Sequence, residues 1–315
     1  MHYRTLGGTG IQIAPLVFGG NVFGWTCDTT RSHALLDRFM ALGLNCIDTA
    51  DLYSAWARTN QGGESEAIIG EWLKTRGGRD KVILSSKVGM WEKRKGLSAA
   101  NIESALEDSL RRLNTDYIDV YFAHIDDPAT PLEQTLRAFE RLINSGKVRA
   151  IGASNYSASR LATARDVCRT SEMPAYQVMQ PVYNLYSRSE FESELAPLAE
   201  SAQIGVIVYY ALASGFLTGK YAELEQIRGT ARERTLEKYF NPRGQRILKA
   251  LHEVGQQTGA TSAQIALAWL LKRPTVTAPI VSATSIEQLD ELVASLSVDL
   301  PEQAMETLNQ ASAEG

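Results

Sequence analysis

Four side chains capable of proton transfer lie at or near the ends of short apolar runs in this sequence. Asp48 ends the run NCID, Lys87 ends KVILSSK and His124 ends YIDVYFAH. Tyr53 lies five residues after Asp48. A lysine beside a tyrosine hydroxyl favours the phenolate and lowers the phenol pKa from about 10. Such a phenol, with a carboxylate holding the lysine, can exchange a proton with a substrate oxygen near neutral pH.

Each of these residues also has an ordinary structural explanation. An Asp after a strand commonly caps a turn, a lysine can extend from a barrel rim, and a histidine can belong to the core. Polar side chains end three further apolar runs, however: Ser154 and Asn155, Gln180, and Tyr209 and Tyr210. Buried polar groups need partners, so six successive runs with polar ends favour one shared site.

Several other catalytic patterns are absent from the sequence. The four histidines form no HxH or HExxH pair, so we expect no metal centre. Neither GxSxG nor GxGxxG occurs, which argues against a nucleophile elbow and against a Rossmann dinucleotide site. The three cysteines form no CxxC, which fits a reducing, cytoplasmic location.

The elements that would position these residues alternate regularly. Apolar, strand-like runs occupy 16–20, 45–48, 81–87, 117–124, 148–155, 175–180, 204–210 and 276–282. Segments of helical length separate them, which is typical of parallel βαβ units, and eight units predict a closed (β/α)8 TIM barrel of the α/β class. Active sites of such barrels lie at the carboxyl ends of the strands.

Three further features complete the predicted architecture. The turn GGTG near the start predicts an N-terminal β-hairpin. The charged segment 219–244, after the seventh run, is either a solvated loop and helix insertion or a flap over a cofactor. No linker rich in Pro, Gly or Ser interrupts the chain, so we expect one domain over 1–315.

The sequence also predicts where several helices begin and end. Capping boxes are expected at Thr130 with Glu133, Thr261 with Gln264, and Ser285 with Gln288. Gly146 is expected to end the helix that begins after Thr130. Apolar residues at helical spacing predict another helix over 97–113.

Composition limits the classes of partner. The 315 residues carry a net charge of −4 with a pI near 5.7, which gives no electrostatic reason to expect nucleic acid. The N-terminus lacks the apolar segment of a secretory signal, and no apolar run approaches the roughly 20 residues of a membrane span. We therefore expect a cytoplasmic enzyme acting on a small molecule.

At this point the motifs are those of a known family. IDTADLYS, SSKVG, DVYFAHIDDPATPLEQTLRAFERLINSGKVRAIGASNYS and IGVIVYYALASGFLTGKY resemble the aldo-keto reductases, and the resemblance covers essentially the whole chain. The last loop is most similar to the bacterial and channel-subunit branches. The resemblance implies an NAD(P)(H)-dependent oxidoreductase that interconverts a carbonyl and an alcohol. Tyr53 would donate or accept the proton, Lys87 would tune it, Asp48 would hold Lys87, and His124 would orient the substrate oxygen.

The resemblance also implies a set of cofactor-binding residues. Ser154, Asn155 and Gln180 would hold the nicotinamide carboxamide. The Tyr209 ring would stack on the nicotinamide, and the backbone of loop 212–217 would hold the pyrophosphate. The full implied set is Gly20, Asn21, Asp48, Ser154, Asn155, Gln180, Tyr209, Tyr210, Ala211, Leu212, Ser214, Gly215, Leu217, Ser282, Thr284 and Gln288.

The chain departs from the family pattern in three places. Tyr210 and Ala211 stand where the family usually has Ser-Pro. The segment VSATSIEQLDEL contains no Lys or Arg for a 2′-phosphate, so NAD(H) competes with the family's usual NADP(H). The longer loop after Tyr53 carries Trp56, and Trp91 follows the third strand. Either tryptophan lines the substrate pocket or packs under its own loop.

Two other functions remain open at this level. One is a cofactor-binding regulatory subunit with slow turnover, as in the channel-associated members. The other is an aldolase that uses Lys87 as a Schiff-base nucleophile.

Overall fold

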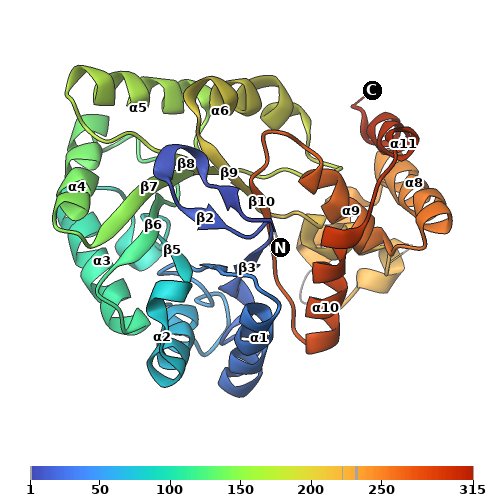
Figure 1. Cartoon of the computed structure of the whole chain (residues 1–315), viewed down its shortest axis with the longest axis horizontal. Helices are drawn as coiled ribbons and strands as arrows, with labels where there is room; N and C mark the ends of the chain where they lie inside the picture. Colours follow the sequence, from blue (N-terminus) through green and yellow to red (C-terminus); the bar gives the residue numbers. More distant parts are fainter. Residues whose placement is uncertain (1, 222, 231–232, 315) are drawn as a thin grey trace.

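Eight parallel strands close into a barrel, as the sequence predicted (Figure 1). This computed structural model describes residues 2–221, 223–230 and 233–314. Around the barrel the strands follow in the order β10 (Ala278–Val281), β3 (Val17–Gly19), β4 (Cys46–Asp48), β5 (Ile83–Val88), β6 (Ile118–Ala123), β7 (Val148–Ser154), β8 (Val178–Gln180) and β9 (Gly205–Val208).

The strand register brings the polar ends of neighbouring strands to one level. Asp48 pairs with Gly19 on one side and with Ser85 on the other. Ser154 pairs with Gln180 between β7 and β8. Several strands end earlier than predicted, so His124, Asn155 and the two tyrosines 209 and 210 lie on the segments that leave the barrel.

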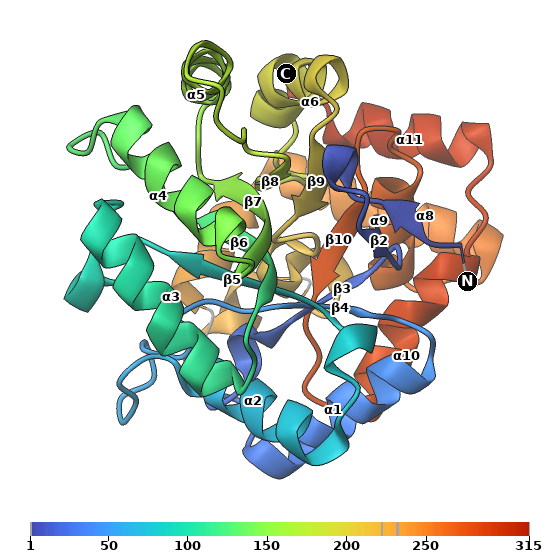
Figure 2. The same ribbon diagram turned by 60° about the vertical axis from the view of Figure 1, so that its left-hand side comes forward.

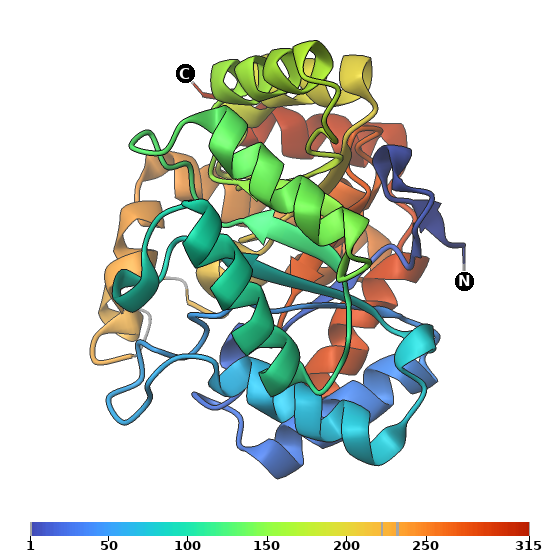
Figure 3. The same cartoon turned by 90° about the vertical axis from the view of Figure 1, so that its left-hand side faces the viewer.

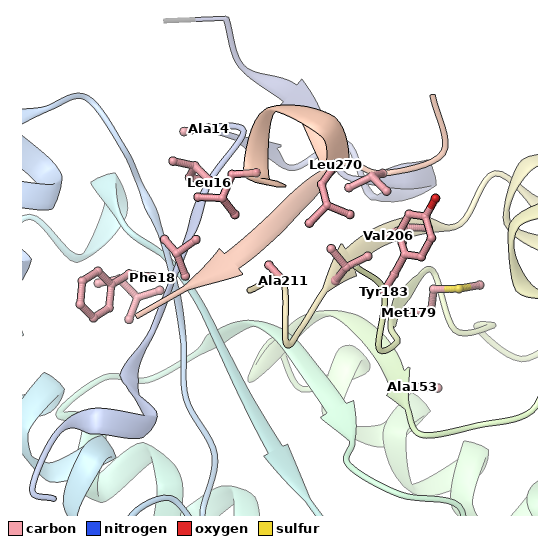
Figure 4. Packing of buried hydrophobic residues seen from close by; sticks show 14 of the residues in the cluster. Ala14, Leu16, Phe18, Ala153, Met179, Tyr183, Val206, Ala211 and Leu270 are labelled. Atoms are coloured by element: carbon pink, nitrogen blue, oxygen red, sulfur yellow. The ribbon is translucent and has the colours of Figure 1, made fainter. Parts of the chain in front are cut away.

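Helices surround the barrel on all sides (Figures 1 and 2). Those next to the strands are α1 (Thr29–Ala41), α2 (Glu64–Arg76), α3 (Ala99–Leu113), α4 (Leu132–Asn144), α5 (Ala158–Thr170), α6 (Ala196–Ala202), α9 (Ser262–Leu271) and α10 (Ile286–Ala294). The additional helices are α7 (Glu233–Leu236), α8 (Pro242–Thr258) and α11 (Glu302–Ser312), of which α8 and α11 contact one another. Apolar side chains between the two layers, such as Phe18 of β3 and Leu270 of α9, form the larger core (Figure 4).

Short helical turns occupy many of the connections. The 3-10 turns are Gly7–Thr9, Gly20–Val22, Arg79–Lys81, Glu92–Arg94, Ala213–Thr218, Leu224–Ile227, Glu237–Tyr239 and Ser295–Ser297, and Phe191–Leu195 is a π-helical turn before α6.

The predicted N-terminal hairpin closes one end of the barrel. It consists of β1 (Arg4–Thr5) and β2 (Gln12–Ile13), which lie across the barrel in Figure 1. Leu6, Ile11 and Ile13 are buried with the apolar side chains that fill the barrel interior. In Figure 3 the hairpin and the light-orange residues 223–230 and 233–239 lie at opposite ends of the barrel. The end that remains open is therefore the one that carries the polar strand ends.

The predicted helix signals are confirmed at some positions and wrong at others. Thr261 and Gln264 form a complete capping box at the start of α9. Thr130 does not cap α4, because its hydroxyl donates to Asp127 and the helix begins at Leu132. The capping box predicted for Ser285 and Gln288 is also wrong. The Gln288 amide oxygen accepts from Thr284 instead of from the N–H of the N-cap residue Ser285.

Two further helix predictions can be compared with the structure. The helix predicted over 97–113 begins two residues later, after its N-cap Ser98. Gly146 has a φ of 74° after the end of α4, as expected for a helix stop.

The segment 219–244 is partly packed instead of fully solvated. Ile227, Leu236 and Tyr239 are buried. The Tyr239 ring stacks on Phe216 at 5.3 Å between centroids, which ties the segment to the loop after β9. Residues 222 and 231–232 of the segment lie outside the described residues.

Candidate active site

Lys87 is the centre of the polar cluster at the barrel mouth. Its ammonium group is fully buried and donates to Asp48 Oδ2 at 2.6 Å, to the Thr49 carbonyl at 2.7 Å and to Tyr53 Oη at 2.9 Å. An ammonium has three N–H donors, so these contacts use all of them. A buried charge is tolerated only with such complete pairing. The arrangement therefore holds Nζ in one position between a carboxylate and a phenol.

Asp48 receives hydrogen bonds at both carboxylate oxygens. Oδ1 accepts from Ser85 Oγ at 2.7 Å and from Gln180 Nε2 at 2.9 Å. Oδ2 accepts from Lys87 and, at 3.3 Å, from the Tyr53 hydroxyl. Side chains from β4, β5 and β8 thus meet on one carboxylate, which fixes its orientation.

Tyr53 is a phenol held in its neutral form. Burial of the hydroxyl end and the Asp48 carboxylate raise the pKa of Tyr53 well above its usual value. The sequence predicted a lowered pKa, and that expectation is wrong for this structure, because desolvation and the carboxylate outweigh the nearby ammonium. Burial also lowers the pKa of Lys87, while Asp48 opposes that change. A neutral phenol at neutral pH suits a proton donor.

His124 lies beside Tyr53, with the two ring centroids 6.1 Å apart. Burial, and secondarily the charge on Lys87, hold the pKa of His124 well below its usual range, so the ring is neutral. Nδ1 is buried and has no hydrogen-bond partner among the described residues. A donor left unpaired would cost more than an acceptor, which favours the proton on Nε2. The neutral ring can then donate a hydrogen bond through Nε2.

The ends of β7, β8 and β9 share a second hydrogen-bond network. Asn155, with a φ of 56°, donates from Nδ2 to the His124 carbonyl at 2.8 Å and accepts from Tyr209 Oη at 2.6 Å. Ser154 Oγ donates to the Gln180 carbonyl at 2.9 Å. The Gln180 amide donates to Asp48, a link between the predicted cofactor residues and the tetrad (Asp48, Tyr53, Lys87 and His124) that the sequence did not indicate.

Gly20 and Asn21 lie at the seam between the first and last barrel strands. Ser282 Oγ is 2.8 Å from the Gly19 carbonyl and 2.7 Å from Asn21 Oδ1. A side chain on Gly19 would place its Cβ 2.7 Å from that same hydroxyl. The structure thus brings together Asn21 and Ser282, which are far apart in sequence and were both predicted to contact a cofactor.

The loop after β9 has an unusual backbone. Tyr210, Ala213, Ser214 and Gly215 all have positive φ, between 48° and 100°. Residues in this conformation turn successive peptide groups toward one side, which is how concave anion-binding backbones form. Ala211 and Leu217 are buried beneath the loop and anchor it to the core, whereas the Tyr210 side chain is exposed. The shape fits the predicted role in holding a pyrophosphate.

The segment after β10 carries no basic side chain of its own. Thr284 donates from both its backbone N–H and its hydroxyl to the Gln288 amide oxygen at 2.9 Å. On α10 the Asp290 carboxylate pairs with Arg38 of α1 through two contacts of 2.8 and 3.0 Å. Arg38, a cation in contact with α10, is therefore already paired with a carboxylate.

Aromatic rings form a row above the tetrad. Trp25 contacts Trp56 at 5.8 Å, and Trp56 contacts Tyr53 at 5.9 Å between ring centroids. Trp56 is 46% exposed and belongs to the loop after Tyr53. Trp91 differs, because it packs against Gly62, where a Cβ would lie 2.6 Å from its ring. The structure thus places Trp56 beside the tetrad and Trp91 against the 54–63 loop.

Sequence reasoning missed three contributors to the site. Ser85 holds Asp48, the carbonyl of Thr49 accepts from Lys87, and Trp25 supports Trp56. Ser85 was recoverable, because it is two residues before Lys87 on one strand and so faces the same side. The roles of Thr49 and Trp25 depend on loop conformation, which leaves no periodic signal.

The described residues contain neither a candidate metal centre nor a membrane-spanning helix. Among residues 2–221, 223–230 and 233–314, no group of three or more His, Cys, Asp or Glu side chains is placed to hold a metal ion. Within the same ranges, none of the helices has the length and apolar character needed to cross a bilayer.

Comparison with known proteins identifies the family. The sequence profile of the Aldo/keto reductase family matches residues 15–313. The chain belongs to the aldo/keto reductase family. This confirms the resemblance drawn from the motifs, and with it an NAD(P)-dependent oxidoreductase built on a (β/α)8 barrel.

Relatives of this aldo/keto reductase include both enzymes and channel-subunit-like proteins. A probable voltage-gated potassium channel subunit beta of Oryza sativa subsp. japonica is 34% identical, covering 95% of this chain and 92% of the relative. The uncharacterized oxidoreductase YrpG of Bacillus subtilis is 33% identical, with 98% and 95% covered. The aldo-keto reductase YhdN of the same organism is also 33% identical, with 93% and 88% covered.

Proposed function

We propose that this protein reduces an aldehyde, ketone or sugar carbonyl to the alcohol, and catalyses the reverse reaction, with Tyr53 as the proton donor or acceptor. The observation that carries the proposal is the buried Lys87 ammonium, which bridges the Asp48 carboxylate and the Tyr53 hydroxyl at 2.6 and 2.9 Å. A phenol fixed beside a paired ammonium can give up its proton to a developing alkoxide, because the ammonium stabilises the phenolate left behind.

The donor set at the barrel mouth fits a nicotinamide dinucleotide. The amides of Asn155 and Gln180 lie at neighbouring strand ends beside the tetrad, next to a loop of positive-φ residues suited to phosphates. When bound, the cofactor supplies or accepts the hydride. Asn155 and Gln180 would hold its carboxamide, the Tyr209 ring would lie against the nicotinamide, and the 212–217 backbone would hold the pyrophosphate.

The remaining steps belong to this chain's own side chains. Neutral His124 donates from Nε2 to the substrate oxygen and orients it toward Tyr53, whose hydroxyl transfers the proton in reduction. Lys87 stabilises the phenolate that results, and Asp48 keeps Lys87 in place. Trp56, exposed beside Tyr53, would form the pocket wall against the substrate's carbon skeleton.

The cofactor preference follows from the charge near α10. A 2′-phosphate needs charge-assisted donors, whereas this segment offers neutral Ser282, Thr284 and Gln288, and the nearby Arg38 is paired with Asp290. We therefore propose that NAD(H) is used effectively alongside the family's usual NADP(H). Comparing kcat/KM for the two cofactors tests this, and a preference for NADP(H) of about a thousandfold would contradict it.

The hydrogen bonds of Lys87 argue against Schiff-base chemistry. A nucleophilic amine needs a free lone pair, but Nζ is fully buried and donates to three acceptors as an ammonium. Treatment with borohydride and a carbonyl substrate is expected to trap no adduct at Lys87. A regulatory subunit with slow turnover is the second candidate, favoured by the channel-subunit names among the relatives.

The direct test of the proposed function is a substrate panel. Aliphatic and aromatic aldehydes, ketones and sugars are offered with each reduced cofactor, and the nicotinamide absorbance is followed. We expect turnover with a kcat of roughly 1 s⁻¹ or more on at least one class. Tight cofactor binding with at most one slow turnover on every substrate would instead support the regulatory subunit.

A further inference from the structure

Asp51 is a buried carboxyl that the proposed reaction does not use. It follows the β4 strand end and is 1% exposed. Neither of its carboxylate oxygens has a hydrogen-bond partner within normal bonding distance among the described residues, although the backbone N–H of Leu52 is near enough to favour the charged form. Its own backbone N–H donates to the carbonyl of Lys87 at 3.3 Å. A buried carboxyl without a partner is unusual, and this one belongs to a residue whose backbone is hydrogen-bonded to that of Lys87.

Charged groups from several elements face this carboxyl. Glu66 of α2 and the cations Arg112 of α3 and Arg94 of the turn after β5 all act on it electrostatically. Glu66 is itself fixed, because it accepts from Ser86 Oγ at 2.5 Å and from Arg112 at 2.6 Å. Asp51 is thus the one member of this group whose charge is not neutralised by direct contact in the described part of the chain.

Two further groups, on the barrel side of Asp51, interact with it electrostatically. Lys87 of β5 is the first, since Asp51 favours its charged form. Tyr121 of β6 is the second, with a buried hydroxyl that also lacks a partner in the described ranges. Burial, with the charge of Glu66, raises the pKa of Asp51 to about 7, while Arg112 and Arg94 oppose the change. The carboxyl therefore changes its charge within the working range of a cellular enzyme.

We propose that Asp51 is a proton-binding positioning residue, whose charge sets how strongly Lys87 acts on Tyr53. The proposal rests on the proposed function of the tetrad. With its proton, Asp51 leaves the positive field of Lys87 intact. Without it, Asp51 adds a second negative charge near Lys87, in addition to Asp48, and offsets part of that field at Tyr53.

The consequence for catalysis has a definite sign. A weaker field makes the phenol of Tyr53 a weaker acid, so proton donation to the carbonyl slows as pH rises through the ionisation of Asp51. We expect kcat/KM for reduction to fall by roughly threefold to tenfold across this step, which corresponds to half a unit to one unit in the pKa of Tyr53. Asp51→Asn, which cannot ionise, is expected to keep the higher kcat/KM across the whole pH range.

The first test measures the NMR signal of the Lys87 side chain and does not depend on catalytic activity. Lysine side-chain resonances labelled with nitrogen-15 are followed between pH 5 and 9, roughly two units either side of the pKa, with Lys87→Met identifying the signal. We expect the Lys87 resonance to shift with a midpoint near 7 in the wild type, to keep that midpoint in Tyr121→Phe, and to lose it in Asp51→Asn. A Lys87 signal without this midpoint in the wild type would overturn the proposal.

The second test measures the pH profile of kcat/KM and separates the two proposals. An identical profile in the wild type and in Asp51→Asn, with the resonance shift present, would show that Asp51 does not act in catalysis. No turnover in any variant would overturn the proposed function, while the Lys87 resonance would still decide whether Asp51 controls that lysine. Cofactor Kd in Asp51→Asn is expected to stay within about twofold of wild type.

A second variant keeps the test decisive should Asp51→Asn fail to fold. Arg94 lowers the pKa of Asp51, and it is a partly exposed side chain paired with Asp108. Arg94→Gln is therefore expected to move the midpoint of the Lys87 resonance to higher pH. A midpoint that stays in place or moves to lower pH would contradict the assignment to Asp51.

Discussion

At the scale of single residues, the site depends on complete pairing of one buried cation. Lys87 is tolerated in the barrel because three acceptors receive its three N–H groups. Those same contacts fix the distance from Nζ to the phenol. Stability and chemistry therefore depend on one set of hydrogen bonds. Removal of the charge on Lys87 or on Asp48 is expected to affect both.

Lys87→Met tests this double role. Loss of the ammonium leaves the buried Asp48 carboxylate without its counter-ion, which is expected to destabilise the fold by about 3–5 kcal/mol. Loss of support for the phenolate is expected to lower kcat by roughly 10²- to 10⁴-fold. Denaturant unfolding and steady-state kinetics measure the two effects, and the exposed Lys93→Met is the matched control. Equal stability of the two variants would contradict the pairing argument.

The pH dependence of the reaction follows from Tyr53 and His124. Because the pKa of Tyr53 is raised, the phenol keeps its proton through neutral pH, and alcohol oxidation should accelerate as the pH rises toward and above about 10. Because the pKa of His124 is lowered, its protonation should not limit activity at pH near 6.5. An acidic limb near pH 6.5 that His124→Gln removes would show that the ring is charged in the free enzyme.

At the scale of elements, the existence of the strands was easier to predict than the starts of the helices. All eight runs proposed from apolar content became barrel strands, because a strand buried on both faces leaves a continuous apolar signal. Thr130 shows where such reasoning fails. Its hydroxyl could accept from the free N–H groups at the helix start or donate to the Asp127 carboxylate, and the structure shows the second bond.

Close packing of α2 on α3 gives a prediction at this scale. A Cβ on Gly70 of α2 would lie 1.9 Å from the Arg112 carbonyl, so the two helices touch through backbone. Gly70→Ala is expected to destabilise the fold by about 1–3 kcal/mol, despite the better helix propensity of alanine. Gly8→Ala, whose Cβ would have no neighbour closer than 3.9 Å, is the control. Thermal unfolding that ranks the control as the less stable variant would contradict this packing.

At the scale of the whole molecule, the closed barrel joins residues that the sequence keeps apart. The motifs alone indicated a tetrad and a cofactor set, and Gln180 shows what they could not indicate. Its amide donates to Asp48 across 132 positions of sequence, which makes one network of the two predicted sets. Such contacts depend on barrel closure and register, and neither property leaves a local pattern.

Burial of Asp51 makes the stability of the whole fold pH-dependent. Its folded-state pKa is about 7 against 3.8 for the free group, so the folded protein binds more protons than the unfolded chain between these values. The contribution of Asp51 to stability therefore falls as pH rises from about 4 to about 7, by roughly 4 kcal/mol in all. Asp51→Asn should remove this fall, as measured by denaturant midpoints. A variant that loses stability with pH as steeply as the wild type would contradict the raised pKa.

The central claim is that Tyr53 transfers the proton while other residues hold the cofactor. The most direct measurement compares wild type and Tyr53→Phe in single-turnover reduction of one active carbonyl substrate, together with cofactor Kd from fluorescence titration. We predict a loss of roughly 10²- to 10⁴-fold in the rate of nicotinamide oxidation, with cofactor Kd within about twofold of wild type. A Tyr53→Phe variant that turns over at a near-normal rate would contradict the assignment of the proton donor.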